Sequence, residues 1–439
     1  MLKERHKTPQ RVVEDVYISL NPVVNFSDRV ATRMIFGCNF CGSCRRSCPE
    51  GIDLGALFQE ARYALVKQGG AAPVFHDYWM RDMEHANKDA WLLQTPHKQA
   101  TVRRVLFTGC QLPASLPETT AALYARMLEL DENTGILMGC CGVPAEWAGD
   151  AVRRQEVTDK LQSALDGMGA SEVVTACPAC QRTLMKALPG YRYRSAIEVL
   201  AEANGSAYAA AEERTWGVFD PCAAKDVPSM QAAARTLLMK AGYRTVGLPA
   251  EWTGVDCCGF GGHIYPANPA LMERIAYAHA ARSEQDYVTY CSNCRDVLSA
   301  VHKKSRHIFE LLLHKEEPLT LDPSYRRRNR MRARKLISVQ SGAVDVCITK
   351  VEKQMEFFYE AAAEQALMRN LILREDVEHI VTEAEQTGER LFDPNRSVTI
   401  AHGRMNTITI WVEYMADDAL CRVVDLYCHR MTVEGERHG

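Results

Sequence analysis

The chain has 439 residues, of which 52 are Lys or Arg and 55 are Asp or Glu, so its net charge is −3. This length predicts two to four domains, and the balanced charge excludes the general basic excess expected of a nucleic-acid-binding protein. The sequence contains no run of about 18 apolar residues, so we predict no transmembrane helix. The N-terminal sequence MLKERHKTPQ lacks the apolar segment of a secretion signal. We therefore expect a cytoplasmic protein without a membrane span.

Cysteine is the most informative residue, because the chain contains 17 of them. In a chain without a secretion signal, such a number indicates metal or redox chemistry before disulfide bracing. Four cysteines lie within residues 38–48, and ten form two sets of five between residues 110 and 294. The three that remain are Cys347, Cys421 and Cys428.

Residues 1–102 are predicted to form a helical, ferredoxin-like segment around the first four cysteines. The sequence GIDLGALFQEARYALVKQG favours a helix with Asp53 as its N-cap and Gly69 as its C-cap. A further helical pattern runs from His76 to Trp91.

From residue 103 the pattern changes to short apolar runs that each end at a cysteine: RRVLFTGC, GILMGCCG and EVVTACPAC. Helical sequences, TTAALYARMLEL and AVRRQEVTDKLQSALDGMG, separate these runs. Such alternation of strands and helices predicts an α/β unit with a parallel sheet. We assign residues 103–205 to this unit.

The same order then recurs in residues 206–325, where WGVFDPC, VDCCGFGG and DYVTYCSNC match the first three runs. Corresponding cysteines are separated by 112 residues (Cys110 and Cys222), 117 residues (Cys140 and Cys257) and 114 residues (Cys177 and Cys291). This period is longer than that of solenoid repeats. It therefore predicts two fused α/β domains that arose by duplication.

Residues 326–439 are expected to form a basic linker and a small α+β domain. The linker is RRRNRMRARK, residues 326–335, with seven positive charges in ten residues. It is a candidate docking site for an acidic ferredoxin or flavoprotein, and a plain solvated linker is the alternative. Beyond it we predict helices over 344–370 and 375–387, the second ended by Gly388, and alternating strands in TITIWVEYM and CRVVDLYCHRMTV.

The first motif is Cys38-x2-Cys41-x2-Cys44-x3-Cys48-Pro49, which has the spacing of bacterial ferredoxins. The short gaps let one loop place its thiolates around a [4Fe–4S] cubane cluster. In two-cluster ferredoxins the fourth cysteine binds the other cluster, so either Cys48 or a remote thiolate completes this site. A zinc ion is the alternative occupant.

Each of the two repeats contains five cysteines in a fixed order: one alone, an adjacent pair followed by glycine, and then a C-x2-C pair. Five thiolates exceed what a tetrahedral zinc ion or a simple cubane requires, which favours a larger or more open cluster. The predicted ligands are Cys110, Cys140, Cys141, Cys177 and Cys180 in the first copy, and Cys222, Cys257, Cys258, Cys291 and Cys294 in the second.

On these residues the chain resembles the cysteine-rich CCG-domain proteins over roughly residues 36–310. That family includes the B-type and D-type components of heterodisulfide reductase, and iron–sulfur subunits of glycolate oxidase, lactate utilisation and anaerobic glycerol-3-phosphate dehydrogenase systems. The resemblance implies a noncubane [4Fe–4S] cluster on each complete five-cysteine set, with zinc in one copy in some members. Joining a ferredoxin motif to two CCG units resembles the D-type component, although this chain has one such motif instead of two.

The resemblance implies an oxidoreductase subunit of an anaerobe that passes electrons from the cubane to the paired CCG clusters, where a disulfide is reduced or formed. Its partners would be a flavoprotein or ferredoxin-type subunit and a disulfide or thiol substrate. The alternative is an electron relay within a flavin-dependent dehydrogenase for lactate, glycolate or glycerol 3-phosphate. GFGGHI does not have the G-x-G-x-x-G spacing, so we expect no flavin or NAD on this chain.

Two further groups of residues have a functional and a structural interpretation. His263 is a candidate catalytic proton donor to a released thiolate, and its alternative is a histidine that caps a helix or bonds to a carbonyl. Trp147 and Trp252 occupy matching places near the two CCG pairs and would shield clusters or fill the core.

The C-terminal region offers a further candidate metal site, formed by His402, Cys421, Cys428 and His429. Cys421 and Cys428 are seven residues apart, so on a regular strand they would face opposite sides of a sheet. We therefore favour a structural role for these cysteines.

Overall fold

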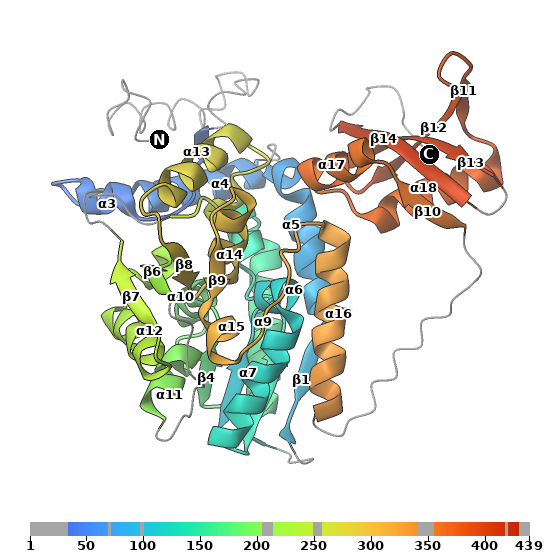
Figure 1. The fold of residues 1–439 in the computed structure, drawn as a ribbon. Coiled ribbons are helices and arrows are strands. Elements are labelled where there is room, and N and C mark those ends of the chain that lie inside the picture. Colours follow the sequence, from blue (N-terminus) through green and yellow to red (C-terminus); the bar gives the residue numbers. More distant parts are fainter. Residues whose placement is uncertain are drawn as a thin grey trace.

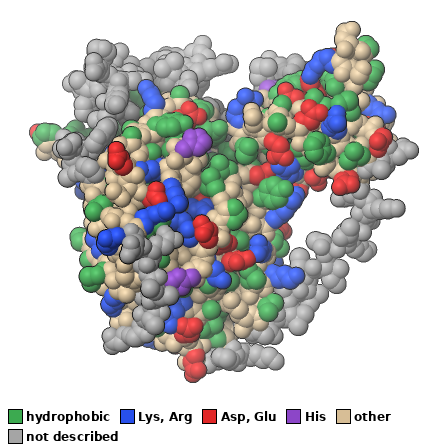
Figure 2. Space-filling view, viewed as in Figure 1, with side chains coloured by type: hydrophobic (Ala, Val, Ile, Leu, Met, Phe, Trp, Pro, Cys, Tyr) green, Lys and Arg blue, Asp and Glu red, His purple; other side chains and the backbone are tan. Residues whose placement is uncertain are grey.

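The computed structural model describes residues 34–68, 72–96, 101–203, 214–248, 257–340, 355–417 and 420–429. A central body contains two α/β units, and the first helices lie along its upper part, whereas a smaller C-terminal domain lies beside helices α5 and α16 (Figure 1). Figure 2 shows that cationic and anionic side chains are interspersed over the face in view. None of the helices in the described ranges is both long and apolar enough to cross a membrane.

The first segment is mainly helical, as predicted, but it also contributes a strand. Its elements are α3 (Ser43–Ser47), α4 (Leu54–Lys67), α5 (Ala72–Asn87) and β1 (Leu92–Gln94). Asp53 caps α4 as predicted, since its carboxylate accepts a hydrogen bond from the Ala56 amide at 3.1 Å. Gly69 lies outside the described residues. The sequence analysis missed β1, which pairs antiparallel with a strand of the first α/β unit.

The first α/β unit forms a sheet in the order β1-β3-β2-β4-β5, in which the strands from β2 to β5 are parallel. Each predicted apolar run forms one of these strands, and helices connect them. The elements are β2 (Arg104–Phe107), α6 (Gln111–Ser115), α7 (Pro117–Leu130), β3 (Thr134–Met138), α8 (Val143–Ala148), α9 (Ala151–Gly167), β4 (Glu172–Thr175), α10 (Pro178–Ala187), β5 (Arg192–Ser195) and α11 (Ala196–Glu202).

The second unit repeats this topology, with parallel strands in the equivalent order β7-β6-β8-β9. Both copies also end in a helix that begins with a capping box, Ser195 with Glu198 and His307 with Glu310. The elements are β6 (Thr215–Phe219), η2 (Cys222–Ala224), α12 (Pro228–Lys240), β7 (Arg244–Gly247), η3 (Gly261–His263), α13 (Pro269–Ala280), β8 (Asp286–Thr289), α14 (Ser292–Ala300), β9 (Ser305–His307) and α15 (Ile308–Leu312). The structure thus agrees with the predicted duplication.

One apolar core is shared by the two copies, and each copy also has a smaller apolar cluster of its own. One cluster of buried side chains contains Tyr124 and Ile136 from the first copy together with Trp216 and Phe309 from the second. Burial of side chains of this size stabilises each copy against the other, by about 1.5–3 kcal/mol for each large apolar residue. The two sheets are therefore held in a fixed relation.

The predicted basic linker is wrong, because residues 326–335 lie inside one helix, α16 (Pro323–Gln340), that packs against α5, α6 and α7. Arg326 and Arg330 point into the protein, where their side chains meet buried carboxylates, and Ala333 and Ile337 join the shared core. The charge run was therefore misleading, since half of this helix surface is interior.

The C-terminal domain is the predicted α+β structure, with a sheet in the order β10-β14-β13-β12-β11. Helix α18 ends at Gly388 in the left-handed conformation, and β13 pairs antiparallel with β14, both as predicted. The helix expected over 344–370 is only partly correct, because residues 356–359 form a strand and residues 344–354 lie outside the described ranges. The elements are β10 (Glu356–Tyr359), α17 (Ala361–Asn370), α18 (Arg374–Thr387), β11 (Leu391–Asp393), β12 (Val398–Met405), β13 (Ile408–Ala416) and β14 (Leu420–His429).

Polar contacts attach this domain to the body through α5 and the start of α16. Arg81 of α5 forms a bidentate ion pair with Asp376 of α18, and the shortest nitrogen–oxygen distances are 2.9 Å. Arg374 meets Asp322 at 2.9 Å, just before α16. Since α5 and α16 also contact each other, the domain is fixed to a helix pair that reaches the centre of the body.

The buried ion pair between Asp82 of α5 and Arg330 of α16 generates the first prediction. Both contacts measure 2.6 Å, and both side chains are at most 2% exposed. Removing one partner leaves a buried charge alone, so Asp82→Asn should lower the free energy of unfolding by about 3–5 kcal/mol.

The matched control lies on the same helix, where Arg332 pairs with Glu118 at the surface. Arg332→Ala should change stability by about 1 kcal/mol or less. Anaerobic urea unfolding of the three chains measures both effects, and equal midpoints for the two variants would contradict the assignment.

Candidate functional site

Both sets of five cysteines lie where the strands of a parallel sheet end. Cys110 follows β2, Cys140 and Cys141 follow β3, and Cys177 follows β4. Because the carboxyl ends of parallel strands meet at one edge of the sheet, residues far apart in sequence are brought together there. The duplicated topology does the same in the second copy.

In the first copy, the five thiols are neighbours in an unbroken series. Cys140 contacts Cys110 and Cys141, Cys141 also contacts Cys180, and Cys180 contacts Cys177. Arg154 donates to the Cys141 carbonyl at 3.2 Å, which fixes the turn between the paired cysteines and α8. The structure therefore brings together all five residues that the sequence predicted.

In the second copy the five thiols form two contacting groups. Cys222 contacts Cys257, and Cys258 lies 3.3 Å from Cys294, which also contacts Cys291. The adjacent cysteines thus point their sulfur atoms to different neighbours.

Two further contacts join the three cysteine motifs to one another. Cys177 of the first copy contacts Cys291 of the second. Cys41 of the ferredoxin-type loop contacts Cys257, whose sulfur also accepts a hydrogen bond from the Asn39 side chain at 3.1 Å. Sulfur contacts therefore connect the loop to the second copy, and the second copy to the first.

Burial differs between the motifs. Nine of the ten CCG cysteines are no more than 8% exposed. Cys222 and the four cysteines of the ferredoxin-type loop are partly exposed. In Figure 1 this loop and α3 project from one side of the body. The solvent-facing end of the sulfur series is therefore the ferredoxin-type loop.

The first two cysteines of the ferredoxin-type loop lie in contrasting electrostatic surroundings. Burial raises the pKa of the Cys38 thiol to about 11, although the nearby Arg62 opposes this effect. A hydrogen bond from Cys257 lowers the pKa of Cys41 to about 6. Metal binding requires thiolates, so proximity to cations and donors prepares part of this loop for that role.

Arg62 of α4 joins the ferredoxin-type loop to both copies, and the sequence analysis did not identify it. Its guanidinium donates to the carbonyls of Cys38 at 3.0 Å, Trp147 at 2.7 Å and Gly262 at 3.2 Å. Burial lowers its pKa to about 10, so it stays cationic at neutral pH. The available sequence signal was an arginine on the mainly apolar face of α4, one residue after Ala61 and three before Leu65.

The glycines of GFGGHI also serve this junction. Gly262 has φ +65°, and a Cβ atom there would lie 2.1 Å from the Cys38 carbonyl oxygen. A Cβ on Gly261 would lie 2.2 Å from the Asn39 carbonyl oxygen. Only glycine permits this approach of the second copy to the ferredoxin-type loop, which explains a Gly-rich sequence without nucleotide-binding spacing.

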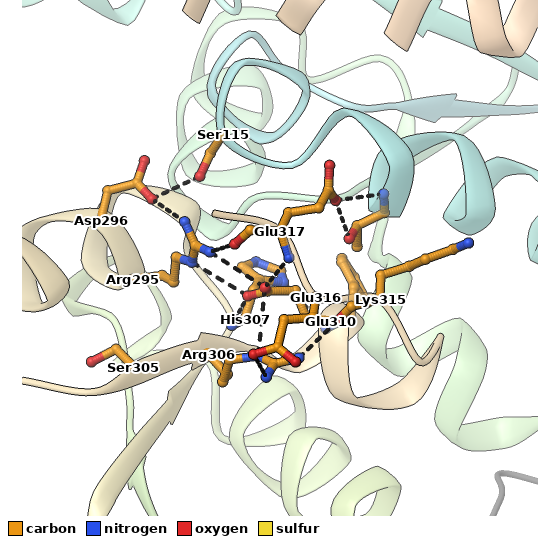
Figure 3. A network of polar contacts seen from close by, with 12 residues as sticks. Ser115, Arg295, Asp296, Ser305, Arg306, His307, Glu310, Lys315, Glu316 and Glu317 are labelled. Atoms are coloured by element: carbon orange, nitrogen blue, oxygen red, sulfur yellow. Dashed lines mark hydrogen bonds and ion pairs between the residues drawn. The ribbon is translucent and has the colours of Figure 1, made fainter. Parts of the chain in front are cut away.

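A buried polar network stands behind the cysteines and joins the copies (Figure 3). Arg295 follows Cys294 and contacts Asp296 at 3.0 Å and Glu310 at 3.3 Å. Asp296 in turn accepts a hydrogen bond from Ser115 of the first copy at 2.7 Å. Figure 3 shows these side chains converging from α14, α15 and α6, so charged groups as well as apolar ones fix the two halves.

Helix α16 extends this network to Cys110. Arg326 donates to Asp296 at 2.7 Å and to the Gln111 side chain at 2.8 Å. The amide of Gln111 donates to the Cys110 sulfur at 3.6 Å, and Arg330 donates to the Cys110 carbonyl at 2.8 Å. The arginines of the predicted linker therefore orient a predicted cluster ligand.

His263 lies among aromatic rings. Its imidazole stacks on Trp79, with 4.2 Å between the ring centroids. It lies perpendicular to the rings of Trp147 and Phe260, with centroid distances of 4.8 and 5.3 Å. Burial, with help from Arg62, holds its pKa well below the ordinary value. A neutral, enclosed imidazole is a poor proton donor, so these surroundings favour packing among the rings over the predicted catalytic role, and the imidazole Nδ1 has no hydrogen-bond partner in the described structure. Trp147 is buried in the same cluster, whereas Trp252 lies outside the described residues.

The C-terminal candidates divide between the two faces of their sheet. Cys421 and Cys428 both face the domain core, which contradicts the expected opposite faces, because a bulge opposite Glu413 and Tyr414 shifts the register by one residue. His402 contacts the ring of Trp411 at 4.5 Å on the other face. The four candidates therefore do not form one site, and Cys347 lies outside the described residues.

Comparison with known proteins agrees with the site geometry. Residues 105–185 and 216–299 each match the cysteine-rich domain family called CCG. The chain therefore contains the CCG domain twice, in the two α/β units described above.

Three relatives indicate the kind of protein in which such domains occur. The B component of the fumarate reductase (CoM/CoB) of Methanothermobacter marburgensis is 22% identical over 280 residues, which cover 60% of this chain and 56% of that protein. The D component of the dihydromethanophenazine:CoB–CoM heterodisulfide reductase of Methanosarcina barkeri is 25% identical over 266 residues, 54% of this chain and 64% of that protein. The corresponding D component of Methanosarcina mazei is 24% identical over 290 residues, 58% of this chain and 70% of that protein.

These relatives are oxidoreductase subunits, and the match covers less than two thirds of the first two. The donor set of this chain fits iron–sulfur clusters, since it consists of thiols grouped by motif and largely screened from water. Among the described residues, no three potential ligands surround one ion position. The thiols form a series of contacts instead.

The close approach at Gly262 generates the second prediction. Gly262→Ala places a side chain on a left-handed backbone and also makes it clash with the Cys38 carbonyl. The clash should lower the free energy of unfolding by about 1–3 kcal/mol beyond the cost of the backbone strain. The thermal unfolding midpoint of the anaerobic protein measures the loss.

Gly388→Ala is the matched control, because Gly388 also has a positive φ, +78°, but no atom within 4 Å of an added Cβ. Its expected cost is about 1–2 kcal/mol. If the two variants melt together, the tight junction between the loop and the second copy is not required.

Proposed function

We propose that the chain is an iron–sulfur electron-transfer subunit of a heterodisulfide-reductase-like complex. In this proposal the ferredoxin-type loop binds a [4Fe–4S] cubane, and each CCG copy binds a noncubane cluster. Together these three clusters reduce or form a disulfide. The observation that carries it is a pair of sulfur contacts, one between the ferredoxin-type loop and the second copy and one between the second copy and the first. The names of the relatives support the assignment to this class of complex.

The proposed ligands are all fourteen motif cysteines. Cys48 is the proposed fourth ligand of the cubane, since Cys421 faces the core of the C-terminal domain. When bound, such clusters supply one-electron transfer over a wide range of potentials. The proposed ligands are Cys38, Cys41, Cys44 and Cys48 for the cubane, then Cys110, Cys140, Cys141, Cys177 and Cys180, and finally Cys222, Cys257, Cys258, Cys291 and Cys294.

The chain itself contributes position and exclusion of water. The contacts of Cys41 with Cys257, and of Cys177 with Cys291, set the three motifs side by side. Parallel strands and the Arg295 network keep those positions fixed. The partly exposed ferredoxin-type loop is the proposed contact for a flavoprotein or ferredoxin-type partner.

A pure relay role is the second candidate, and one observation favours it. Nine of the ten CCG cysteines are almost fully buried among the described residues, whereas a disulfide substrate must reach sulfur or iron. Cys222 is the partly exposed member of the two copies. A relay subunit of a flavin-dependent dehydrogenase needs no such access.

The third prediction concerns metal content. Anaerobically purified protein should hold about twelve irons per chain, four for each cluster, with an EPR signal from the CCG clusters that changes on addition of thiol or disulfide. About twelve irons without that response would favour the relay. About four irons with zinc would leave only the ferredoxin-type cluster and end the proposed disulfide chemistry.

A pair of serine variants makes the assignment specific. Cys291→Ser should lower the iron content by about four atoms per chain and remove one EPR component. Cys428→Ser, in the C-terminal sheet, should leave both unchanged. Equal iron in the two variants would contradict binding at the second CCG copy.

A further inference from the structure

The side chain of Arg62 is a fully buried cation with every donor in use. Its exposed fraction is 0%. A guanidinium has five N–H groups, and Arg62 makes five hydrogen bonds, all to main-chain carbonyls: two to Ile35, at 3.2 and 3.1 Å, and one each to Cys38, Trp147 and Gly262. These bonds satisfy its hydrogen-bonding capacity but supply no opposite charge.

Arg62 differs in this respect from the other buried arginines of the described chain. Arg295, Arg326, Arg330 and Arg374 each pair with at least one carboxylate, at 2.6–3.0 Å for the contacts that define them. No carboxylate of the described residues pairs with Arg62. Its remaining neighbours are the rings of Phe36 and Phe40, 4.8 and 4.5 Å from the guanidinium carbon.

An isolated buried cation is strongly unfavourable, because its contacts with aromatic rings return less free energy than its desolvation costs. Such a group is retained when a nearby anion offsets the cost. Arg62 interacts with His263 and Cys38, and of these two Cys38, a proposed cluster ligand, is the group that can become an anion. A [4Fe–4S] core with four thiolate ligands has a net negative charge, and reduction makes that charge more negative by one unit.

We propose that Arg62 is the buried counter-ion of the ferredoxin-type cluster, and that it sets the potential of this cluster while fixing its loop against both CCG copies. The inference rests on the proposed function, since it requires a cluster on Cys38–Cys48. A fixed cation stabilises the reduced, more negative state more than the oxidised one. Arg62 therefore raises the reduction potential.

The same side chain acts as a positioning residue. The carbonyl of Trp147 belongs to α8 of the first copy, and that of Gly262 belongs to η3 of the second. One guanidinium thus holds the ferredoxin-type loop against both copies. Charge and position are coupled in one group, and a lysine, a point charge without the planar fork, can replace only the charge.

The test is an EPR-monitored redox titration of the ferredoxin-type cluster in the full chain, with iron per chain measured on each sample. Arg62→Gln should shift the midpoint of this cluster to a more negative value. Arg62→Lys, which keeps the charge, should shift it much less but should lose iron to a chelator faster than the native chain. Arg374→Gln removes an arginine that pairs with Asp322, just before α16, and with Glu364 of the C-terminal domain, so it should leave the midpoint unchanged.

Three results would overturn the inference. The first is an Arg62→Gln chain that retains its iron and titrates at the native midpoint. The second is an equal negative shift in the glutamine and lysine variants, which would assign the effect to position alone. The third is a large negative shift in the lysine variant, which decides the question if the glutamine variant does not fold. In that case a native-like midpoint with faster iron loss supports the inference.

Failure of the inference is distinguishable from failure of the proposed function. A native chain without iron on the ferredoxin-type loop removes the counter-ion and the proposed function together. A native chain with about twelve irons whose midpoint does not depend on Arg62 removes only the role assigned to this arginine.

Discussion

Parallel strands deliver the residues that follow them to a common edge, and the whole site depends on this constraint. Every CCG cysteine in the first copy follows a strand closely or lies in the first turn of the next helix, so the fold converts a sequence separation of more than a hundred residues into sulfur contact. The sheet order is the same in both copies. The contact between Cys177 and Cys291 is therefore a product of topology and not of local sequence.

Apolar and polar interactions share the work of holding the edges together. The common core fixes the two sheets against each other, and the Arg295 and Arg326 networks act next to the cysteines. Buried ion pairs contribute little net stability compared with apolar side chains of the same size. Their value here is geometric, because each one specifies how a helix next to a cysteine is oriented.

Much of this arrangement was predictable from the sequence. The duplication, the strand before each cysteine and the α+β tail follow from periodicity and spacing, and Gly388 ends its helix as expected. Other features depend on contacts that a local pattern does not contain. In the sequence the arginines of α16 resemble a solvent-exposed charge run. In the structure some of them point inward, because they pair with Asp82 and Asp296, which are at least 30 residues away. The bulge that brings Cys421 and Cys428 to one face arises from pairing with β13.

The bond from Arg330 to the Cys110 carbonyl spans 220 residues of sequence, and it has a consequence for biosynthesis. Domains that fold as units do so during synthesis, starting from the N-terminus. The first copy cannot follow that course to completion, because part of its core and the support for Cys110 belong to α16. Its thiols reach their final positions only when residue 340 has left the ribosome. Insertion of the proposed cluster into the first copy would therefore follow translation of most of the chain.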